Sequence, residues 1–307
     1  MVLRTFPRDP AIGNEYDTPA GDPGWFGPDS VTWRVHADFA GMLAGGLSAL
    51  YLQTLHPRAL AGVWDHSDFR HDLLGRLRRT TAFVAGTTFA NTDSANRLTA
   101  RVRAIHARVR GVDEHGTAYA ADDPALLTWV HVTEVWSFLE GHWRYGPMPA
   151  PAPEADRYFA ETARIAEALG ARDVPRSASE VSTYLDEIQP VLRFGERSRA
   201  VLTVLEGVSL PVPLPGLARG LFLGAGAALL PSWAERLMER SIAQRRAASA
   251  AALALKGLAP VLRAALHDGL AARAMRRCGR NPAELAHWPA RPPDSIVVNA
   301  PIHDTAR

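Results

Sequence analysis

A histidine on the predicted helix 91–110 is the first residue whose type and position indicate chemistry. A buried neutral imidazole can ligate haem iron, and guanidinium groups can neutralise haem propionates. His106 is therefore a candidate iron ligand, and Arg101, one of several arginines around it, is a candidate propionate partner. The spacing alone equally fits a histidine at the edge of the core that bonds a backbone carbonyl. The apolar stripe that His106 borders has helical spacing and consists of Leu98, Val102, Ile105 and Val109.

The next predicted helix, 124–145, carries two polar groups on a segment that is otherwise apolar on every side. A helix that is hydrophobic all round is expected at the centre of a fold. His131 and Glu134 are three residues apart, so they share one face of this helix. Buried polar groups are paired or bind something. The pair therefore indicates either a metal site of the di-iron-bundle kind, or a hydrogen-bonded His131 with Glu134 near a surface arginine.

A third candidate site lies in the arginine-rich stretch 75–81. Arg76 and Thr80 are four residues apart and share a helix face, and Arg79 is adjacent to that face. A charged donor and a hydroxyl together could hold an anion or a bound oxygen molecule. The alternative is a solvated arginine face, which the composition favours because only one of the 34 basic residues is a lysine.

Helices must position all three candidate sites, because helical signals dominate the chain. Capping residues at Asn91 and Asp123 and a break at His56 before Pro57 mark boundaries. A small hairpin or loop is expected at 112–121, and no other run of strands is visible. The expected helices are 31–55 (one or two), 73–89, 91–111, 124–145, 154–170, 178–192, and two or three more within 217–278.

The prediction for the whole chain is an all-α protein with one helical domain. An N-terminal extension is expected at 1–28, the helical catalytic domain at 29–278 and an extended C-terminal tail at 279–307. Segment 1–28 lacks the apolar run of a signal peptide, which favours a cytoplasmic location. The alanine-rich C-terminal helices leave a homodimer open.

The composition excludes several classes of protein. Apolar residues make up 47% and charged residues 21%, which is typical of globular chains and not of disordered ones. The single cysteine, Cys278, excludes a disulfide framework, a zinc ribbon and an iron–sulfur cluster held by this chain alone. A net charge of +2 provides no strong field for a nucleic-acid partner.

Two apolar stretches, 37–55 and 217–230, are too short and too interrupted to span a membrane. They are expected to form buried core helices, and the alternative is a surface that makes peripheral contact with a membrane or a greasy substrate. Glycines at 41, 45 and 46 would let another helix or a flat ligand approach the first stretch closely.

Three segments together resemble the DUF2236 family, which is also described as the catalytic domain of ER-bound oxygenases and of rubber oxygenases (latex clearing proteins). The segments are GRLRRTT at 75–81, VRAIHARVRG at 102–111 and YAADDPALLTWVH at 119–131. The resemblance covers roughly residues 25–240 in one order. It implies an all-α fold with a globin-like core, to which extra N- and C-terminal helices are added here.

The resemblance also implies a cofactor. Rubber-cleaving members carry haem b with one axial histidine and use dioxygen to cleave carbon–carbon double bonds. By order and spacing His106 matches that histidine. Arg76, Arg79 and Thr80 match an Arg-x-x-Lys-Thr motif near the haem, with arginine replacing lysine. His131 lies in a signature of the wider family, and with Glu134 it is assigned a supporting role beside the site.

One departure from the family bears on the substrate. Rubber oxygenases use a glutamate as base upstream of the arginine–threonine motif, and the corresponding region here, 55–64, contains no carboxylate. His56 and Asp65 are the candidates to replace it. The expected function is therefore a haem b-dependent oxygenase or oxidoreductase for a small apolar or phenolic substrate. The alternatives are a haem or apolar-ligand binding protein without turnover, and a non-haem metal oxygenase using His106, His131 and Glu134.

Overall fold

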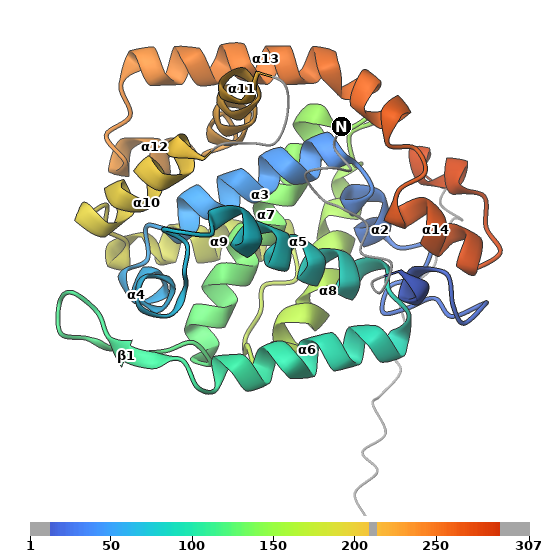
Figure 1. Cartoon of the computed structure of the whole chain (residues 1–307), viewed down its shortest axis with the longest axis horizontal. Helices are drawn as coiled ribbons and strands as arrows, with labels where there is room; N and C mark the ends of the chain where they lie inside the picture. Colours follow the sequence, from blue (N-terminus) through green and yellow to red (C-terminus); the bar gives the residue numbers. More distant parts are fainter. Residues whose placement is uncertain (1–12, 209–213, 289–307) are drawn as a thin grey trace, which may run out of the picture.

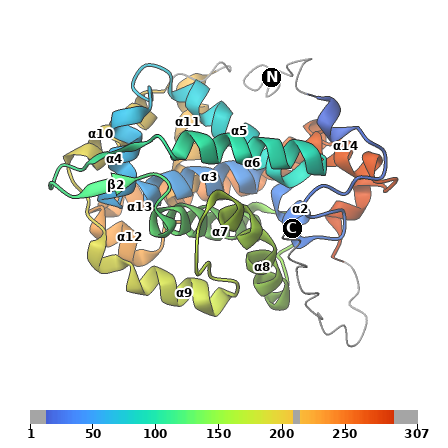
Figure 2. The same ribbon diagram turned by 90° about the horizontal axis from the view of Figure 1, so that it is seen from below.

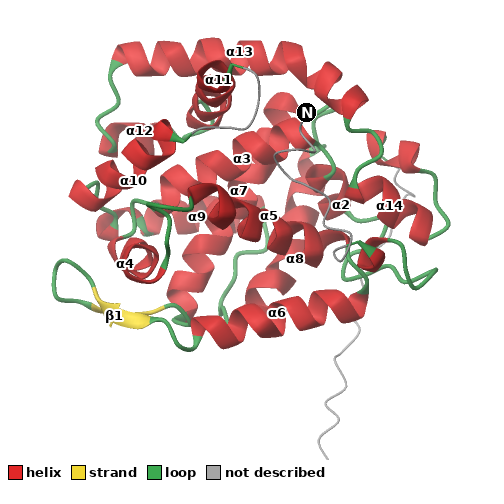
Figure 3. Ribbon diagram, viewed as in Figure 1, coloured by secondary structure: helices red, strands yellow, loops and turns green. Residues whose placement is uncertain are grey.

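The computed structural model describes residues 13–208 and 214–288, and this part of the chain is helical apart from one two-stranded hairpin (Figures 1 and 3). The predicted all-α class is confirmed. The first half contains α2 (Val31–His36), α3 (Phe39–Gln53), α4 (Pro57–His66), α5 (Leu73–Phe89), α6 (Thr92–His106), β1 (Arg110–Val112) and β2 (Ala118–Ala120). The second half contains α7 (Pro124–Tyr145), α8 (Ala152–Leu169), α9 (Ala178–Glu187), α10 (Glu196–Gly207), α11 (Pro215–Ala227), α12 (Ser232–Leu237), α13 (Ile242–Ala265) and α14 (Leu270–Arg277). Short 3-10 helices are η1 (Asn14–Tyr16), η2 (Gln189–Val191) and η3 (Pro282–Ala286).

Local capping chemistry sets the helix boundaries. The Asn91 side chain accepts a hydrogen bond from the backbone N–H of Ser94 at 2.8 Å, and α6 begins at the next residue. Asp123 caps α7 in the same way, and α4 begins at Pro57 directly after His56. The predicted hairpin is present as well. Two differences are clear. Helix α6 stops at His106 instead of continuing to Gly111, and α4 and α10 lie outside the expected helical ranges.

The centre of the fold is the contact between α3 and α7, which lie side by side in Figures 1 and 2. Their backbones almost touch: a Cβ atom on Gly141 would lie 2.3 Å from the carbonyl oxygen of Gly41. A Cβ on Gly45 would lie 2.5 Å from the carbonyl oxygen of Ser137. Glycines on α3 were expected to admit a helix or a flat ligand, and the partner at Gly41 and Gly45 is the helix α7.

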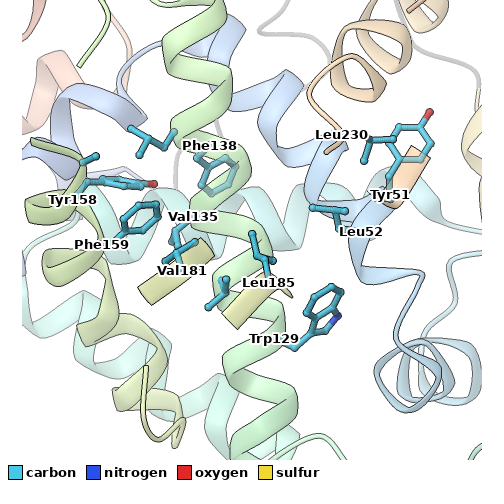
Figure 4. Packing of buried hydrophobic residues seen from close by; sticks show 14 of the residues in the cluster. Tyr51, Leu52, Trp129, Val135, Phe138, Tyr158, Phe159, Val181, Leu185 and Leu230 are labelled. Atoms are coloured by element: carbon cyan, nitrogen blue, oxygen red, sulfur yellow. The ribbon is translucent and has the colours of Figure 1, made fainter. Parts of the chain in front are cut away.

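Further helices surround this pair. In Figure 1, α11 and α13 cover α3 on one side, while α5 and α6 lie on the opposite side of the molecule. Helices α8 and α9 pack against α7, and the interior between them is aromatic and aliphatic (Figure 4). The buried side chains labelled there include Trp129, Phe138, Tyr158, Phe159 and Leu185.

Two expectations need correction. The predicted apolar stripe of α6 is not a buried face, since Ile105 is 50% exposed and the buried positions are Ala95 and Thr99. The reason is that only the first half of α6 packs on the body of the protein. The tail predicted as extended, 279–307, contains η3 in the part that the structure describes, and residues 289–307 lie outside that part.

Candidate functional site

His106 occupies the last position of α6, where the helix leaves its neighbours. Close to the turn between α5 and α6 the two helices meet tightly, because Gly86 leaves space for Leu98. From there they diverge, as Figures 1 and 2 both show. His106 is half-buried, and burial lowers its pKa, so the imidazole is neutral at physiological pH. Its Nδ1 atom is buried and has no hydrogen-bond partner among the described residues. Arg101 is exposed on the same helix.

The facing part of α5 is open on every side. All five residues from Arg78 to Ala82 are exposed, and five residues exceed one helical turn. Within this turn, the Arg79 guanidinium lies 3.5 Å from the carboxylate of Asp72, and the Thr80 hydroxyl donates to the carbonyl of Arg76 at 3.2 Å. These contacts are made within α5 and its cap. Among the described residues, no hydrogen bond or ion pair joins Arg79 or Thr80 to His106.

Arg76 differs from its neighbours on α5. It is half-buried, and burial is the main reason why its pKa is lowered, with the nearby charge of Arg79 adding to the effect. Its guanidinium has no carboxylate partner within the described ranges 13–208 and 214–288. A partly desolvated cation without a counter-ion is unfavourable, so this position is suited to an incoming anion.

A second group of polar side chains lies on α7. His131 is only 6% exposed, its Nε2 has no partner in the described structure, and burial lowers its pKa to about 4. Glu134, one turn along, has its pKa raised to about 7 by burial. The surface arginine expected beside Glu134 is not found in the described part of the chain. At neutral pH His131 is therefore neutral and Glu134 is partly protonated.

This face of α7 adjoins a buried hydrogen-bonded chain that connects three other helices. His36 of α2 is bonded at both ring nitrogens, with Nδ1 2.8 Å from the Thr88 hydroxyl and Nε2 2.8 Å from the Tyr158 hydroxyl. Burial lowers the pKa of His36 to about 3, and the nearby histidines on α7 contribute. Burial raises the pKa of Tyr158, and the charge of Glu134 contributes. His36, Thr88, Tyr158 and the α7 pair thus form one buried polar cluster.

The sequence did not single out His36, Thr88 or Tyr158 as a unit. The three residues lie on α2, α5 and α8, and the two hydrogen bonds span 52 and 122 positions of the chain. No periodicity within one helix can reveal such contacts. The available signal was a histidine placed between apolar residues on a short helix, which also fits an ordinary core residue.

The two candidates for a replacement base differ in their surroundings. His56 precedes Pro57 at the start of α4, is buried, and has its pKa lowered to about 4, mainly by burial, while its Nδ1 has no partner among the described residues. The Asp65 carboxylate accepts a hydrogen bond of 2.6 Å from the hydroxyl of Tyr119, which fixes the hairpin to α4. Glu134 is thus the carboxyl group that most resembles an acid–base catalyst by its surroundings.

A metal held by protein side chains alone would need several donors in one place. Among the residues that the structure describes, no three His, Cys, Asp or Glu side chains are grouped so that they could hold a metal ion. His106 ends α6, whereas His131 and Glu134 belong to α7. The three-ligand arrangement considered from the sequence is not assembled there.

Comparison with known proteins gives one match. The family model described as "ER-bound oxygenase mpaB/B'/Rubber oxygenase, catalytic domain" matches residues 33–281, a longer region than the motifs alone indicated. A search of curated proteins and a search of solved structures found no match. The matched region runs from α2 to the end of α14 and includes every candidate side chain discussed above. The chain therefore belongs to the family of ER-bound oxygenase and rubber oxygenase catalytic domains.

Proposed function

We propose that this oxygenase domain binds haem b through His106 and oxidises a small apolar or phenolic substrate with dioxygen. The observation that carries the proposal is the state of His106: a half-buried neutral imidazole with an unpartnered Nδ1, at the position where the family resemblance puts an axial ligand. Iron requires the neutral form of the ring, which burial favours.

Side chains on α5 and α6 also offer groups that suit a haem. Arg76 offers a half-buried guanidinium that lacks a carboxylate, and a propionate would supply one. Arg101, Arg79 and Thr80 are exposed on the diverging parts of α6 and α5, where a flat ligand would meet the fewest packed side chains. A bound haem would supply the activation of dioxygen, and the protein would supply the iron ligand, the anion partners and the enclosure.

Glu134 is our candidate for proton transfer. Its pKa of about 7 leaves the carboxyl group partly protonated at neutral pH, so it can release or accept a proton at a carboxyl oxygen. This carboxyl group would take the place of the upstream glutamate that the segment 55–64 lacks. His131, on the same face of α7, would orient it, and the cluster around His36 and Tyr158 would hold this face in place.

The presence of the cofactor is tested on the purified full-length chain, produced with haem precursor and also reconstituted in vitro. Visible absorption, a pyridine haemochrome assay and iron analysis are read together. The proposal predicts a Soret band and about one b-type haem and one iron per chain. Neither band nor iron after reconstitution would contradict it. Iron without a porphyrin band would instead favour the non-haem alternative.

Turnover distinguishes the enzyme from a protein that binds haem or an apolar ligand without reacting. Oxygen uptake is measured with a panel of alkenes and phenols. Glu134→Gln is expected to lower kcat on the order of a hundredfold while haem content stays the same. Glu140→Gln is the matched control, because it removes another carboxyl of α7 whose pKa burial also raises. Equal loss in both variants would refute a specific role for Glu134, and no uptake with any substrate would favour the binding protein.

A further inference from the structure

Helix α13 forms one edge of the molecule and packs through only one of its faces (Figure 1). The inward positions recur with helical spacing and are all buried: Ala248, Ala252, Leu255 and Ala259. They lie against residues of α3 and α11 and against Tyr145 of α7. The opposite face of this 24-residue helix is therefore not covered by other described parts of the chain.

The outward face is apolar although it is exposed. Leu253 is 74% exposed and Val261 is 64% exposed, and the exposed positions between them are Ala254, Lys256, Gly257, Leu258 and Pro260, of which only Lys256 is polar. Ile242 at the start of the helix is also exposed. Within the described residues, α13 is the helix that is long and apolar enough to cross a bilayer by length and composition, and 22% of that apolar window is buried.

The packing of α13 favours a position along a surface and not across a membrane. Arg263, near its end, donates a hydrogen bond of 2.9 Å to the carboxylate of Asp38 at the start of α3. Gly224 of α11 meets α13 closely, since a Cβ atom there would lie 2.6 Å from the Cβ of Ala251. The helix is thus fixed to the domain along its length, with its apolar outer face directed away.

The charges on α13 have one sign. From Ser241 to His267 the sequence contains no aspartate or glutamate, but it contains Arg245, Arg246, Lys256 and Arg263. Arg245 approaches Glu235 at 3.5 Å, and Arg263 is paired as described above. Arg246 and Lys256 have no carboxylate partner in the structure as described. Lys256 is also the only lysine of the chain.

We propose that the outer face of α13 binds the surface of an anionic lipid bilayer. Leu253 and Val261 would enter the boundary between headgroups and acyl chains, and Arg246 and Lys256 would meet anionic headgroups. A second copy of the chain fits this face less well. In a symmetric pair the acid-free face would meet itself, and no carboxylate would neutralise Arg246 or Lys256.

The neighbouring helix α11 adds apolar groups to the same end of the domain. Leu214 and Leu217, at its first turn, are each 71% exposed. Helix α11 also lacks acidic residues. Contact with a bilayer would place the domain where apolar molecules accumulate. The proposal does not depend on the haem or on the identity of the substrate, since it rests on α13 and α11 alone.

Co-sedimentation of the full-length protein with vesicles tests the proposal. One set of vesicles is phosphatidylcholine alone, and the other contains phosphatidylglycerol as well. Wild-type protein is expected to bind the mixed vesicles, and added salt is expected to release it. Replacing Arg246 and Lys256 by glutamine should weaken binding about fivefold for each cation lost. Leu253→Glu and Val261→Glu should weaken binding by at least the same factor, because they put a charge at the apolar boundary.

The control is Val112→Glu, which places the same charge on an exposed apolar residue of the hairpin and should bind like wild type. Circular dichroism and thermal unfolding verify that each variant is folded. Failure of folded wild-type protein to bind mixed vesicles would overturn the proposal. So would equal, salt-independent binding to both kinds of vesicle. A dimer that Leu253→Glu converts to monomers, without vesicle binding by the wild type, would show that the face joins two copies of the chain.

Discussion

Two successive parts of α7 show opposite uses of the same helix. Near its end, Ser137 and Gly141 bring the backbones of α7 and α3 so close that a methyl group does not fit between them. In the preceding turns, His131 and Glu134 are enclosed but keep unpartnered polar atoms or a perturbed pKa. The end of the helix gains packing, whereas the middle retains groups that are unfavourable to bury. Stability is thus concentrated in one part of α7 and candidate chemistry in the other.

The largest effect should come from filling the α3 contact. Gly141→Val would place its Cβ 2.3 Å from the Gly41 carbonyl oxygen, which belongs to a backbone that cannot move independently. We expect the free energy of unfolding in urea to fall by about 3 kcal/mol or more. Gly46→Ala is the control on the same helix pair, because its nearest neighbour would be a ring carbon of Phe138 at 3.6 Å. It should change stability by less than about 1 kcal/mol. Similar losses of unfolding free energy in both variants would show that the close backbone contact at Gly141 is not what limits side-chain size in this helix pair.

The next effect concerns Glu134, and it is a gain of stability instead of a loss. The pKa of Glu134 rises from 4.5 to about 7 on folding, so the folded state binds its proton more tightly than the unfolded state. The wild type should therefore lose stability as pH rises from about 4.5 to about 7, whereas Glu134→Gln lacks this loss. The variant should be more stable above pH 7, by up to about 3 kcal/mol.

Urea unfolding of both proteins across this pH range provides the measurement. Buried histidines such as His36 and His131 have lowered pKa values and affect stability in the opposite direction. Because the folded state disfavours their protonation, the protein loses stability as pH falls below about 6.5. Their contribution is common to both proteins and cancels in the difference. A constant difference from pH 4.5 to pH 8 would show that Glu134 is not desolvated as described.

The smallest expected effect concerns two hydroxyl groups of α7, those of Ser137 and Thr133. Ser137 Oγ is buried without a partner in the described structure, whereas the Thr133 hydroxyl donates to the carbonyl of Trp129 at 2.9 Å. Ser137→Ala should raise the free energy of unfolding by roughly 0.5–1 kcal/mol, because it removes an unpaired polar group. Thr133→Ala should lower it by about 1 kcal/mol, since a hydrogen bond is lost. Destabilisation by Ser137→Ala would mean that its hydroxyl has a partner after all.

The sequence predicted where helices begin better than it predicted which of their faces are buried. Asn91 and Asp123 act through neighbouring residues, so the helix starts that they mark were predictable, whereas Pro57 indicated a break and not the helix α4 that begins there. Spacing also indicated that His131 and Glu134 share a face of a central helix. Whether a helix is covered along its whole length depends on distant segments, and for that reason the exposure of Ile105 was not foreseen.

The same limit applies to the candidate site. The pattern marked His106, Arg76 and Glu134 individually, because residue type and spacing are local properties. The pairing of His36 with Tyr158 depends on how α2 packs against α8, which no local pattern encodes. The lack of a carboxylate beside Arg76, and of an arginine beside Glu134, likewise became visible only with the positions of the surrounding helices.

Haem titration distinguishes His106 on α6 from His131 on α7 as the residue that would hold the iron of a bound haem. Wild type, His106→Ala, His131→Ala and the exposed-residue control His115→Ala are titrated with haemin, and Soret spectra and haem stoichiometry are recorded. Circular dichroism verifies the fold of each protein. We expect about one tightly bound haem per chain in all except His106→Ala, which should lose the imidazole-ligated spectrum. A wild-type spectrum and stoichiometry in His106→Ala, or their loss in His131→Ala alone, would contradict it.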